Sequence, residues 1–130
     1  MKLGFASAIL PDQNFEYVVD FASQNGYRCV EMMCWPTGKA ERRYAGVTHI
    51  DTERLDASRI AAIKDYLAKK NVSISALGYY PNPLDPDAEK AGEAIAHIKK
   101  LIKTAPLLGV DTVNTFIGRD PARPIERQWE

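Results

Sequence analysis

The chain has 130 residues and a mass of 14.5 kDa, a length that indicates one domain. Apolar residues make up 45% and charged residues 26% of it, which excludes disordered, collagen-like and low-complexity classes. Seventeen basic residues balance seventeen acidic ones, so no net field gathers nucleic acid or an anionic membrane, and we expect neither as a partner.

The N-terminal sequence and the cysteines predict a cytoplasmic protein. Almost no apolar segment precedes the Ala6-Ser7-Ala8 triplet, so a secretion signal is not expected. No apolar run reaches the roughly eighteen residues of a membrane span. Cys29 and Cys34 are five positions apart, on opposite faces of an expected strand, and we interpret them as structural thiols.

Strand-like apolar runs alternate with helical patterns along the chain. Strands are expected at residues 3–10, 27–35, 72–77 and 110–117. The first helix, which includes Phe15, Val18 and Ala22, follows Asp12 or Asn14 as its cap and ends at Gly26. The second and third helices are predicted from the apolar spacing of two further sets: Ile60, Ile63 and Leu67, then Ala88, Ala91, Ile95, Ile98 and Ile102, with a bend at Pro106.

This alternation predicts an α/β fold with a parallel sheet. Four units form either a small doubly wound sheet or the first four βα units of a (β/α)8 TIM barrel, an incomplete barrel. One alternating set of strand residues is apolar and is expected to face the helices: Val30, Met32, Val72, Ile74, Ala76, Val113 and Ile117. The other is mixed and suits a barrel interior: Cys29, Glu31, Met33, Ser73, Ser75, Leu77, Thr112, Asn114 and Phe116. The mixed set favours the half barrel, since both faces of a doubly wound sheet are covered.

The loops that follow the strands are long and begin near Pro11, Trp35, Tyr79 and Gly118, so a functional site is expected at that end of the sheet. Glu31 lies within an apolar strand, where burial of an unpaired carboxylate is costly, so it either has a buried partner or contacts substrate. Of the two histidines, His49 is either a loop residue in solvent or a ligand contact, and His97 is expected at the surface or at an interface.

Aromatic residues at the strand ends suit the faces of a sugar ring, although packing at the rim of the core is an equal alternative for each of them: Trp35, Tyr79, Tyr80 and Phe116. Arg119 and Asp120 follow the fourth strand and either bind an anionic or hydroxylated substrate or take part in a loop salt bridge. Metal-ligand spacing, phosphate-binding glycine loops and a G-x-S-x-G elbow are absent from the sequence.

Three segments carry a resemblance to a known family: Val30 to Pro36, Leu77 to Leu84 and Val113 to Asp120. They resemble the sugar phosphate isomerase/epimerase family of the xylose isomerase-like TIM barrel superfamily. The resemblance implies an enzyme that moves a proton on a sugar or cyclitol with a divalent metal (Mn, Mg, Co or Zn), held by Glu, Asp, His and Glu from later strands. The resemblance assigns no metal ligand and no catalytic residue to residues 1–130. It does imply six substrate-binding candidates: Trp35, His49, Tyr79, Asn82, Phe116 and Arg119.

The resemblance also implies that residues 1–130 are the N-terminal half of a barrel, truncated before the fifth strand and inactive alone. Exposed edges of such a half barrel favour self-association. Two alternatives remain open at this point. One is a four-stranded flavodoxin-like binding module without catalysis, and the other is an endonuclease IV-like phosphodiesterase, which the neutral charge disfavours.

Overall fold

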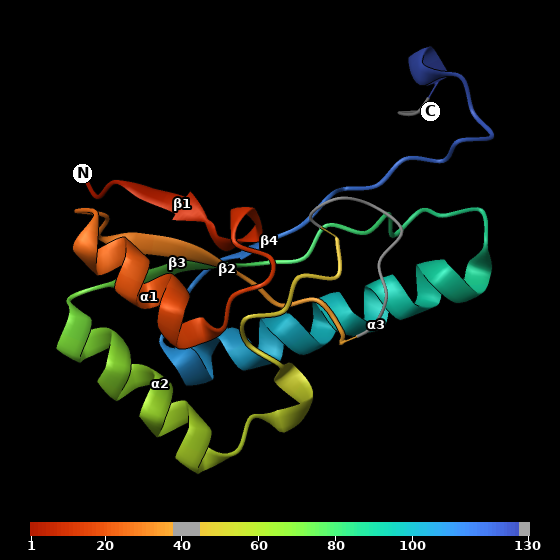
Figure 1. Ribbon diagram of the computed structural model, residues 1–130. Coiled ribbons are helices and arrows are strands. Elements are labelled where there is room, and N and C mark those ends of the chain that lie inside the picture. Colours follow the sequence, from red (N-terminus) through yellow and green to blue (C-terminus); the bar gives the residue numbers. More distant parts are fainter. Residues whose placement is uncertain (38–44, 128–130) are drawn as a thin grey trace.

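A computed structural model describes residues 1–37 and 45–127 of the chain. Its centre is a sheet of four parallel strands in the order β1-β2-β3-β4. The strands are β1 (Gly4–Ala6), β2 (Cys29–Met33), β3 (Ser73–Gly78) and β4 (Val113–Asn114). The helices that connect them are α1 (Phe15–Gln24), α2 (Ala57–Lys70) and α3 (Ala88–Thr104), all on one side of the sheet (Figure 1).

The helices begin and end where their sequences predict. The Asn14 side chain accepts a hydrogen bond from the Tyr17 amide and caps α1, and Gly26, which follows the helix, has a φ of 79°. Asp56 and Asp87 cap α2 and α3 in the same way. A short 3-10 helix (Ala105–Leu108) continues α3 through Pro106, at the predicted bend.

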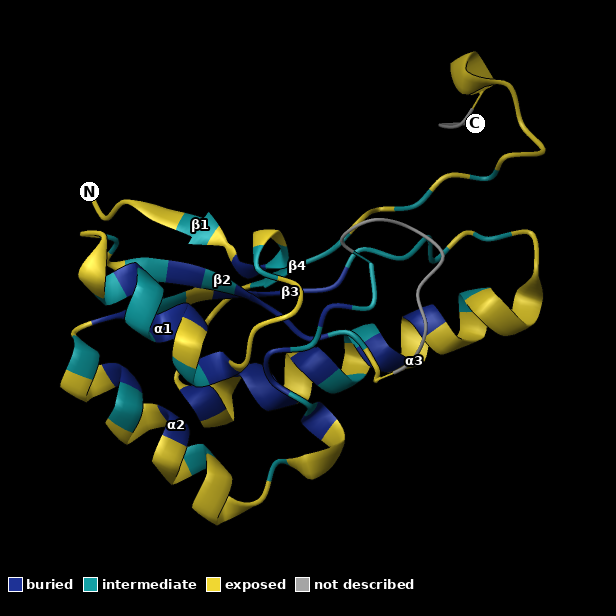
Figure 2. Ribbon diagram, in the orientation of Figure 1, coloured by how far each residue is buried: buried dark blue, intermediate teal, exposed yellow. Residues whose placement is uncertain are grey.

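One core lies between the helices and the sheet (Figure 2). Its largest fully buried side chains come from α1, β2, α2, β3 and α3: Phe15, Met32, Ile63, Leu77 and Leu101. We call the opposite face of the sheet the inner face. None of α1, α2 and α3 lies on it, so the arrangement is that of a partial TIM barrel and not of a doubly wound sheet, whose two faces both carry helices.

The division of β3 between the two faces differs from the expectation. Val30 pairs with Ile74 but Glu31 pairs with Ala76, so Ser75 is an extra residue in a bulge. The bulge inverts the alternation, so Leu77 lies opposite Met32 and belongs to the core, while Ala76 lies opposite Glu31 on the inner face. The assignments of Ala76 to the helix side and Leu77 to the inner face are therefore wrong.

Three further expectations need correction. The first and fourth strands are shorter than 3–10 and 110–117, because a 3-10 turn (Ser7–Ile9) ends β1 and β4 has a partner on one side only. Ile117, expected against the helices, is 78% exposed.

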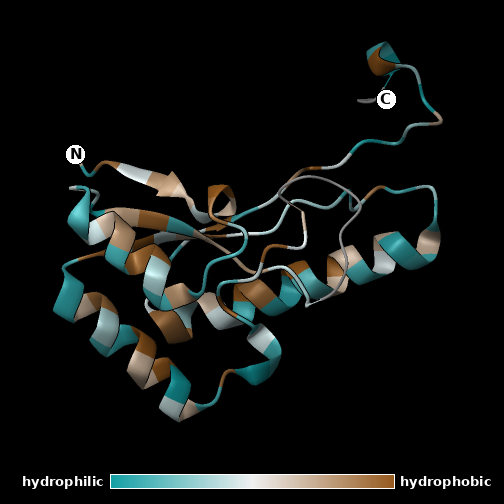
Figure 3. Cartoon of the chain, viewed as in Figure 1, coloured by the Kyte–Doolittle hydropathy of each residue, from teal (hydrophilic) through white to brown (hydrophobic). Residues whose placement is uncertain are grey.

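The apolar stripe of α3 is also shifted around the helix. Its buried residues are Ala94, His97, Leu101 and Thr104. Ile95 and Ile102, expected in the core, are 40% and 56% exposed. Hydrophobic and hydrophilic residues alternate along α3 (Figure 3). His97 is thus a buried residue and not a surface one.

The long connection expected at residues 36–56 is present, although residues 38–44 within it lie outside the described part. Among the described residues, no helix is both long and apolar enough to span a membrane. Cys29 and Cys34 are both free, and burial raises the pKa of the Cys34 thiol to about 12.

Candidate functional site

Glu31 and Tyr80 form the polar centre of the inner face. Glu31 is the middle residue of β2, and Tyr80 follows β3 by two residues. The Tyr80 hydroxyl donates a hydrogen bond to Glu31 Oε1. A Cβ atom at Gly78 would lie 2.7 Å from the same Oε1 and still closer to Met33 Cε, so the ends of the Glu31 and Met33 side chains both lie against the Gly78 backbone and would have to shift to admit a larger residue.

The surroundings of Tyr80 keep its phenol protonated. Burial, followed by the hydrogen bond to Glu31, raises the pKa of Tyr80 to about 12, while a hydrogen bond with Asn114 opposes the rise. Asn114 belongs to β4, so the polar group draws on three adjacent strands. At neutral pH the phenol is a hydrogen-bond donor, and Glu31 is its acceptor. Within the chain, Glu31 therefore has one partly buried hydrogen-bond partner, Tyr80.

Phe116 provides an apolar wall beside this pair. Its ring centroid is 5.2 Å from that of Tyr80, with an angle of 55° between the planes, and 55% of the residue is exposed. The side chains of Glu31, Tyr80, Asn114 and Phe116 are thus brought together on the inner face, toward the carboxyl ends of β2, β3 and β4. Tyr80 and Asn114 are absent from the six candidates chosen by resemblance, although Tyr80 stands in the aromatic series and Asn114 in the mixed strand set.

Trp35 and Tyr79 lie toward the helices instead. Their ring centroids are 5.0 Å apart in an edge-to-face contact. Tyr79 is only 5% exposed and also packs against His97, at 4.4 Å between centroids. The indole Nε1 of Trp35 is buried and has no acceptor within the two described stretches of the chain. The structure therefore separates these two aromatic residues from Phe116.

His49 joins three segments of the fold. Its Nε2 is 3.1 Å from the Leu10 carbonyl oxygen, so Nε2 carries the proton, and Nδ1, 2.8 Å from Ser7 Oγ, accepts from the hydroxyl. Ser7 Oγ in turn accepts from the Met33 amide at 2.9 Å. With 6% exposure, His49 is not a residue in solvent, and both of its ring nitrogens are engaged by the protein.

This environment predicts a pH-dependent stability. Burial lowers the pKa of His49 below its ordinary value of 6.5, against the opposing effect of the Leu10 carbonyl. Below about pH 6.5 the unfolded chain takes up a proton that the folded chain resists, so the free energy of unfolding should fall as the pH falls. Urea titrations from about pH 7 to 5 check this, and His49→Gln should lose that part of the slope. An unchanged slope in His49→Gln would refute the assignment.

Asn82 and Arg119 are brought together through the Arg119 backbone. Asn82 Nδ2 donates to the Arg119 carbonyl oxygen at 2.7 Å, and the Arg119 amide donates to Asn82 Oδ1 at 2.8 Å. Asp120 follows Arg119 and pairs with Arg123, at 3.5 Å between side-chain atoms, so this loop contains a salt bridge, formed by Asp120 with Arg123.

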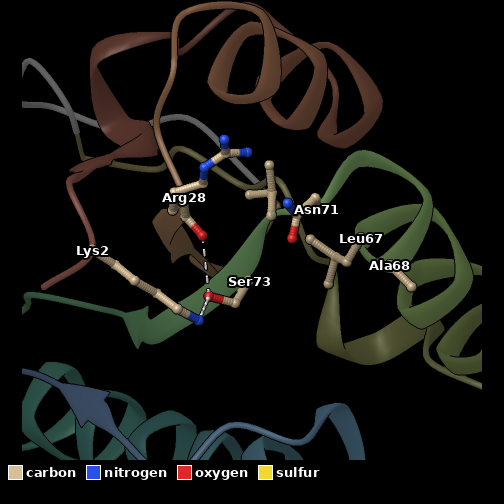
Figure 4. Close-up of a pocket in the computed structure, with 7 residues that line it drawn as sticks. Lys2, Arg28, Leu67, Ala68, Asn71 and Ser73 are labelled. Carbon is tan, nitrogen blue, oxygen red and sulfur yellow. Dashed lines mark hydrogen bonds between the residues drawn. The ribbon is translucent and has the colours of Figure 1, made fainter.

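Two hollows lie away from the inner-face residues. One, of about 180 Å³, lies at the amino ends of the strands and is lined by side chains that include Lys2, Arg28, Asn71 and Ser73 (Figure 4). There Lys2 Nζ donates to Ser73 Oγ at 3.2 Å. The other, of about 470 Å³, lies between the loop after β2 and α2, with His49, Asp51 and Arg59 in its lining.

Among the residues that the structure describes, no group of three or more His, Cys, Asp or Glu side chains could hold a metal ion. Glu31 offers one carboxylate, and Tyr80 already occupies one of its oxygens. Since divalent ions in proteins usually take three or four protein ligands, these residues do not fit a metal site by themselves.

Comparison with known proteins is consistent with this geometry. The model of one protein family, described as xylose isomerase-like TIM barrel, matches residues 19–130. No curated protein sequence matches the chain. Among solved structures, AsbF, the probable 3-DHS dehydratase involved in petrobactin synthesis from Bacillus anthracis, is 18% identical with a TM-score of 0.64, over 92% of this chain and 39% of AsbF.

A second similar structure is that of the IOLI protein with a binding zinc atom. It is 19% identical, with a TM-score of 0.63, over 98% of this chain and 42% of that protein. At these identities the likeness concerns the fold. The chain spans about two fifths of the length of both proteins.

Proposed function

The chain belongs to the xylose isomerase-like TIM barrel family, and on that premise we propose that it supplies the first four βα units of an enzyme that isomerises or epimerises a sugar or cyclitol. The domain in this proposal comprises residues 1–130. The observation that carries it is the pair of Glu31 and Tyr80 on the inner face, at the carboxyl ends of the strands, where TIM barrels hold their substrates.

The chemistry of this wall favours an uncharged, hydroxyl-bearing part of the substrate. Glu31 presents a carboxylate whose second oxygen suits a donating hydroxyl, and Phe116 presents an apolar ring beside it. A phosphate or carboxylate would be repelled by Glu31. We therefore place the polyol end of the substrate here and any anionic group against another part of the barrel.

The six candidates divide on this proposal, and Asn82 is engaged by the Arg119 backbone and not by substrate. Phe116 lines the substrate wall, and Arg119 lies at its rim, exposed. Trp35 and Tyr79 support the wall from the helix side. His49 holds the segment after β1 in place through its hydrogen bonds with Ser7 and Leu10. Tyr80 and Asn114 join the substrate wall through the hydrogen bonds of the Tyr80 hydroxyl with Glu31 and Asn114.

A divalent metal, one of Mn, Mg, Co or Zn, is proposed for the whole enzyme, by analogy with the zinc atom in the IOLI structure. Because the described residues do not fit a complete site, no step on this chain is derived through an ion. What the chain's own residues do is orient hydroxyls: Tyr80 fixes the Glu31 carboxylate, which then has a set direction toward the substrate. The two free cysteines suit the reducing cytoplasm, where we propose that the enzyme works.

The test uses the enzyme that contains this chain together with the rest of the barrel. We expect solvent deuterium to enter a ketohexose or a cyclitol ketone at the carbon beside the carbonyl. Tyr80→Phe should raise KM roughly tenfold or more with a smaller change in kcat, because a bond to a charged group contributes about 1.5–3 kcal/mol. Tyr17→Phe, exposed on α1, is the matched control. Cleavage of abasic DNA without any exchange would contradict the proposal and support a phosphodiesterase.

We also propose that the isolated 130-residue chain self-associates. Among the described residues, the edge strands β1 and β4 each pair on one side only. Four apolar residues are also exposed: Phe116, Ile117, Ile95 and Ile102. Sedimentation velocity over a hundredfold range of concentration should show dimers or larger species, fewer in an Ile117→Ser variant. A stable monomer across that range would contradict this proposal.

A further inference from the structure

One amide side chain connects the loops that follow β3 and β4. Asn82 Oδ1 accepts a hydrogen bond from the Arg119 amide, and Asn82 Nδ2 donates one to the Arg119 carbonyl oxygen. One side chain therefore binds both backbone polar groups of Arg119. The Leu84 amide also donates to Oδ1, at 3.1 Å. In a sheet, the backbone of a neighbouring strand would form these two hydrogen bonds with Arg119, and here the Asn82 side chain forms them instead.

The approach of the two loops depends on Gly118. Its φ is 101°, a conformation that other residues rarely adopt, and a Cβ atom there would lie 2.9 Å from both Asn82 Oδ1 and Leu84 Cγ. Gly118 thus lets the backbone turn and lets Asn82 reach Arg119.

The contact between Asn82 and Arg119 lies beyond the last backbone hydrogen bond between β3 and β4. Between β3 and β4 the Leu77 amide donates to the Thr112 carbonyl and the Tyr79 amide to the Asn114 carbonyl, both at 3.0 Å. The segment after β4 runs away from the sheet toward the C-terminus (Figure 1). Asn82 bridges the chains after the ladder has ended.

We propose that Asn82 is a positioning residue, which fixes the path of the chain from Gly118 onward through the Arg119 backbone and does not bind substrate. Both of its polar atoms are engaged by backbone groups, so neither is directed at a ligand. The consequence is that the Arg119 side chain, and the segment that follows it, take their direction from the loop after β3. This inference concerns the chain alone and stands whatever reaction the enzyme performs.

Amide hydrogen exchange on the 130-residue chain tests it. Asn82→Ala should speed exchange of the Arg119 and Leu84 amides by about tenfold or more, while the Tyr79 amide, held by Asn114, keeps its protection. Gly118→Ala should do the same from the other loop. Because both substitutions break the same contact, between Asn82 and the Arg119 backbone, the Arg119 amide should exchange no faster in the double variant than in either single variant. Asn25→Ala, in a turn at the other end of the sheet, is the control and should leave Arg119 unaffected.

Asn82→Asp distinguishes a specific contact from general loop packing. An aspartate keeps the oxygen that accepts from the Arg119 and Leu84 amides but, when ionised, has no proton for the Arg119 carbonyl. At neutral pH these two amides should therefore exchange more slowly in Asn82→Asp than in Asn82→Ala. Unchanged Arg119 exchange in Asn82→Ala, additive effects in the double variant, or equal exchange in Asn82→Asp and Asn82→Ala would each overturn the proposal.

Discussion

Ser7→Ala should lower the free energy of unfolding by about 2–4 kcal/mol, because it leaves two buried polar groups without a partner. The Met33 amide loses the acceptor that it finds in Ser7 Oγ, and His49 Nδ1 loses its donor. Ser7 is fully buried, so no solvent replaces either bond. Urea unfolding at pH 7 measures the loss, with Ser73→Ala as the control, since Ser73 is partly exposed and bonds to the side chain of Lys2.

Loss of the hydrogen bond between Ser7 and His49 should also change how stability depends on pH. If Ser7 holds His49 in the neutral form, a Ser7→Ala variant should also show a changed dependence of stability on pH between about 7 and 5. A loss of less than about 0.5 kcal/mol would show that the two bonds are not formed in solution.

His97→Ala should lower the free energy of unfolding by a similar amount, about 2–4 kcal/mol. His97 Nε2 donates to the Cys34 carbonyl oxygen at 2.7 Å and its ring packs on Tyr79, so the substitution removes a buried bond and opens a cavity. Lys99→Ala on the exposed side of α3 is the control for helix propensity. Thermal unfolding measures both, and equal values for the two variants would contradict the burial of His97.

The sequence predicts the helices well because their signals are local. Asn14 and Gly26 bracket α1, and Asp56 precedes α2, so capping chemistry and apolar spacing are sufficient to place them. The α/β class follows from the alternation alone. Strand ends are not local: β4 is shorter than its apolar run because strand length depends on a neighbour that pairs with it.

The errors in the site have specific physical causes. His97 stands three residues after Ala94 and four before Leu101, a spacing that places it on the buried stripe of α3, but the larger isoleucines one position away conceal that stripe. Tyr79 follows the inverted half of β3, so its side chain enters the core, and Tyr80 takes the inner face instead. Hydropathy gives no sign of this inversion, since Ser75 is an ordinary strand residue.

The extra residue in β3 has a consequence for comparing this chain with its relatives. On either side of Ser75 the strand obeys a two-residue period, but the two halves are out of phase by one position. An ungapped alignment with a relative whose strand lacks the insertion matches the residues of one half to counterparts on the opposite surface. A single gap at Ser75 restores the correspondence, and it decides whether Tyr79 or Tyr80 is equated with a residue that faces the barrel axis.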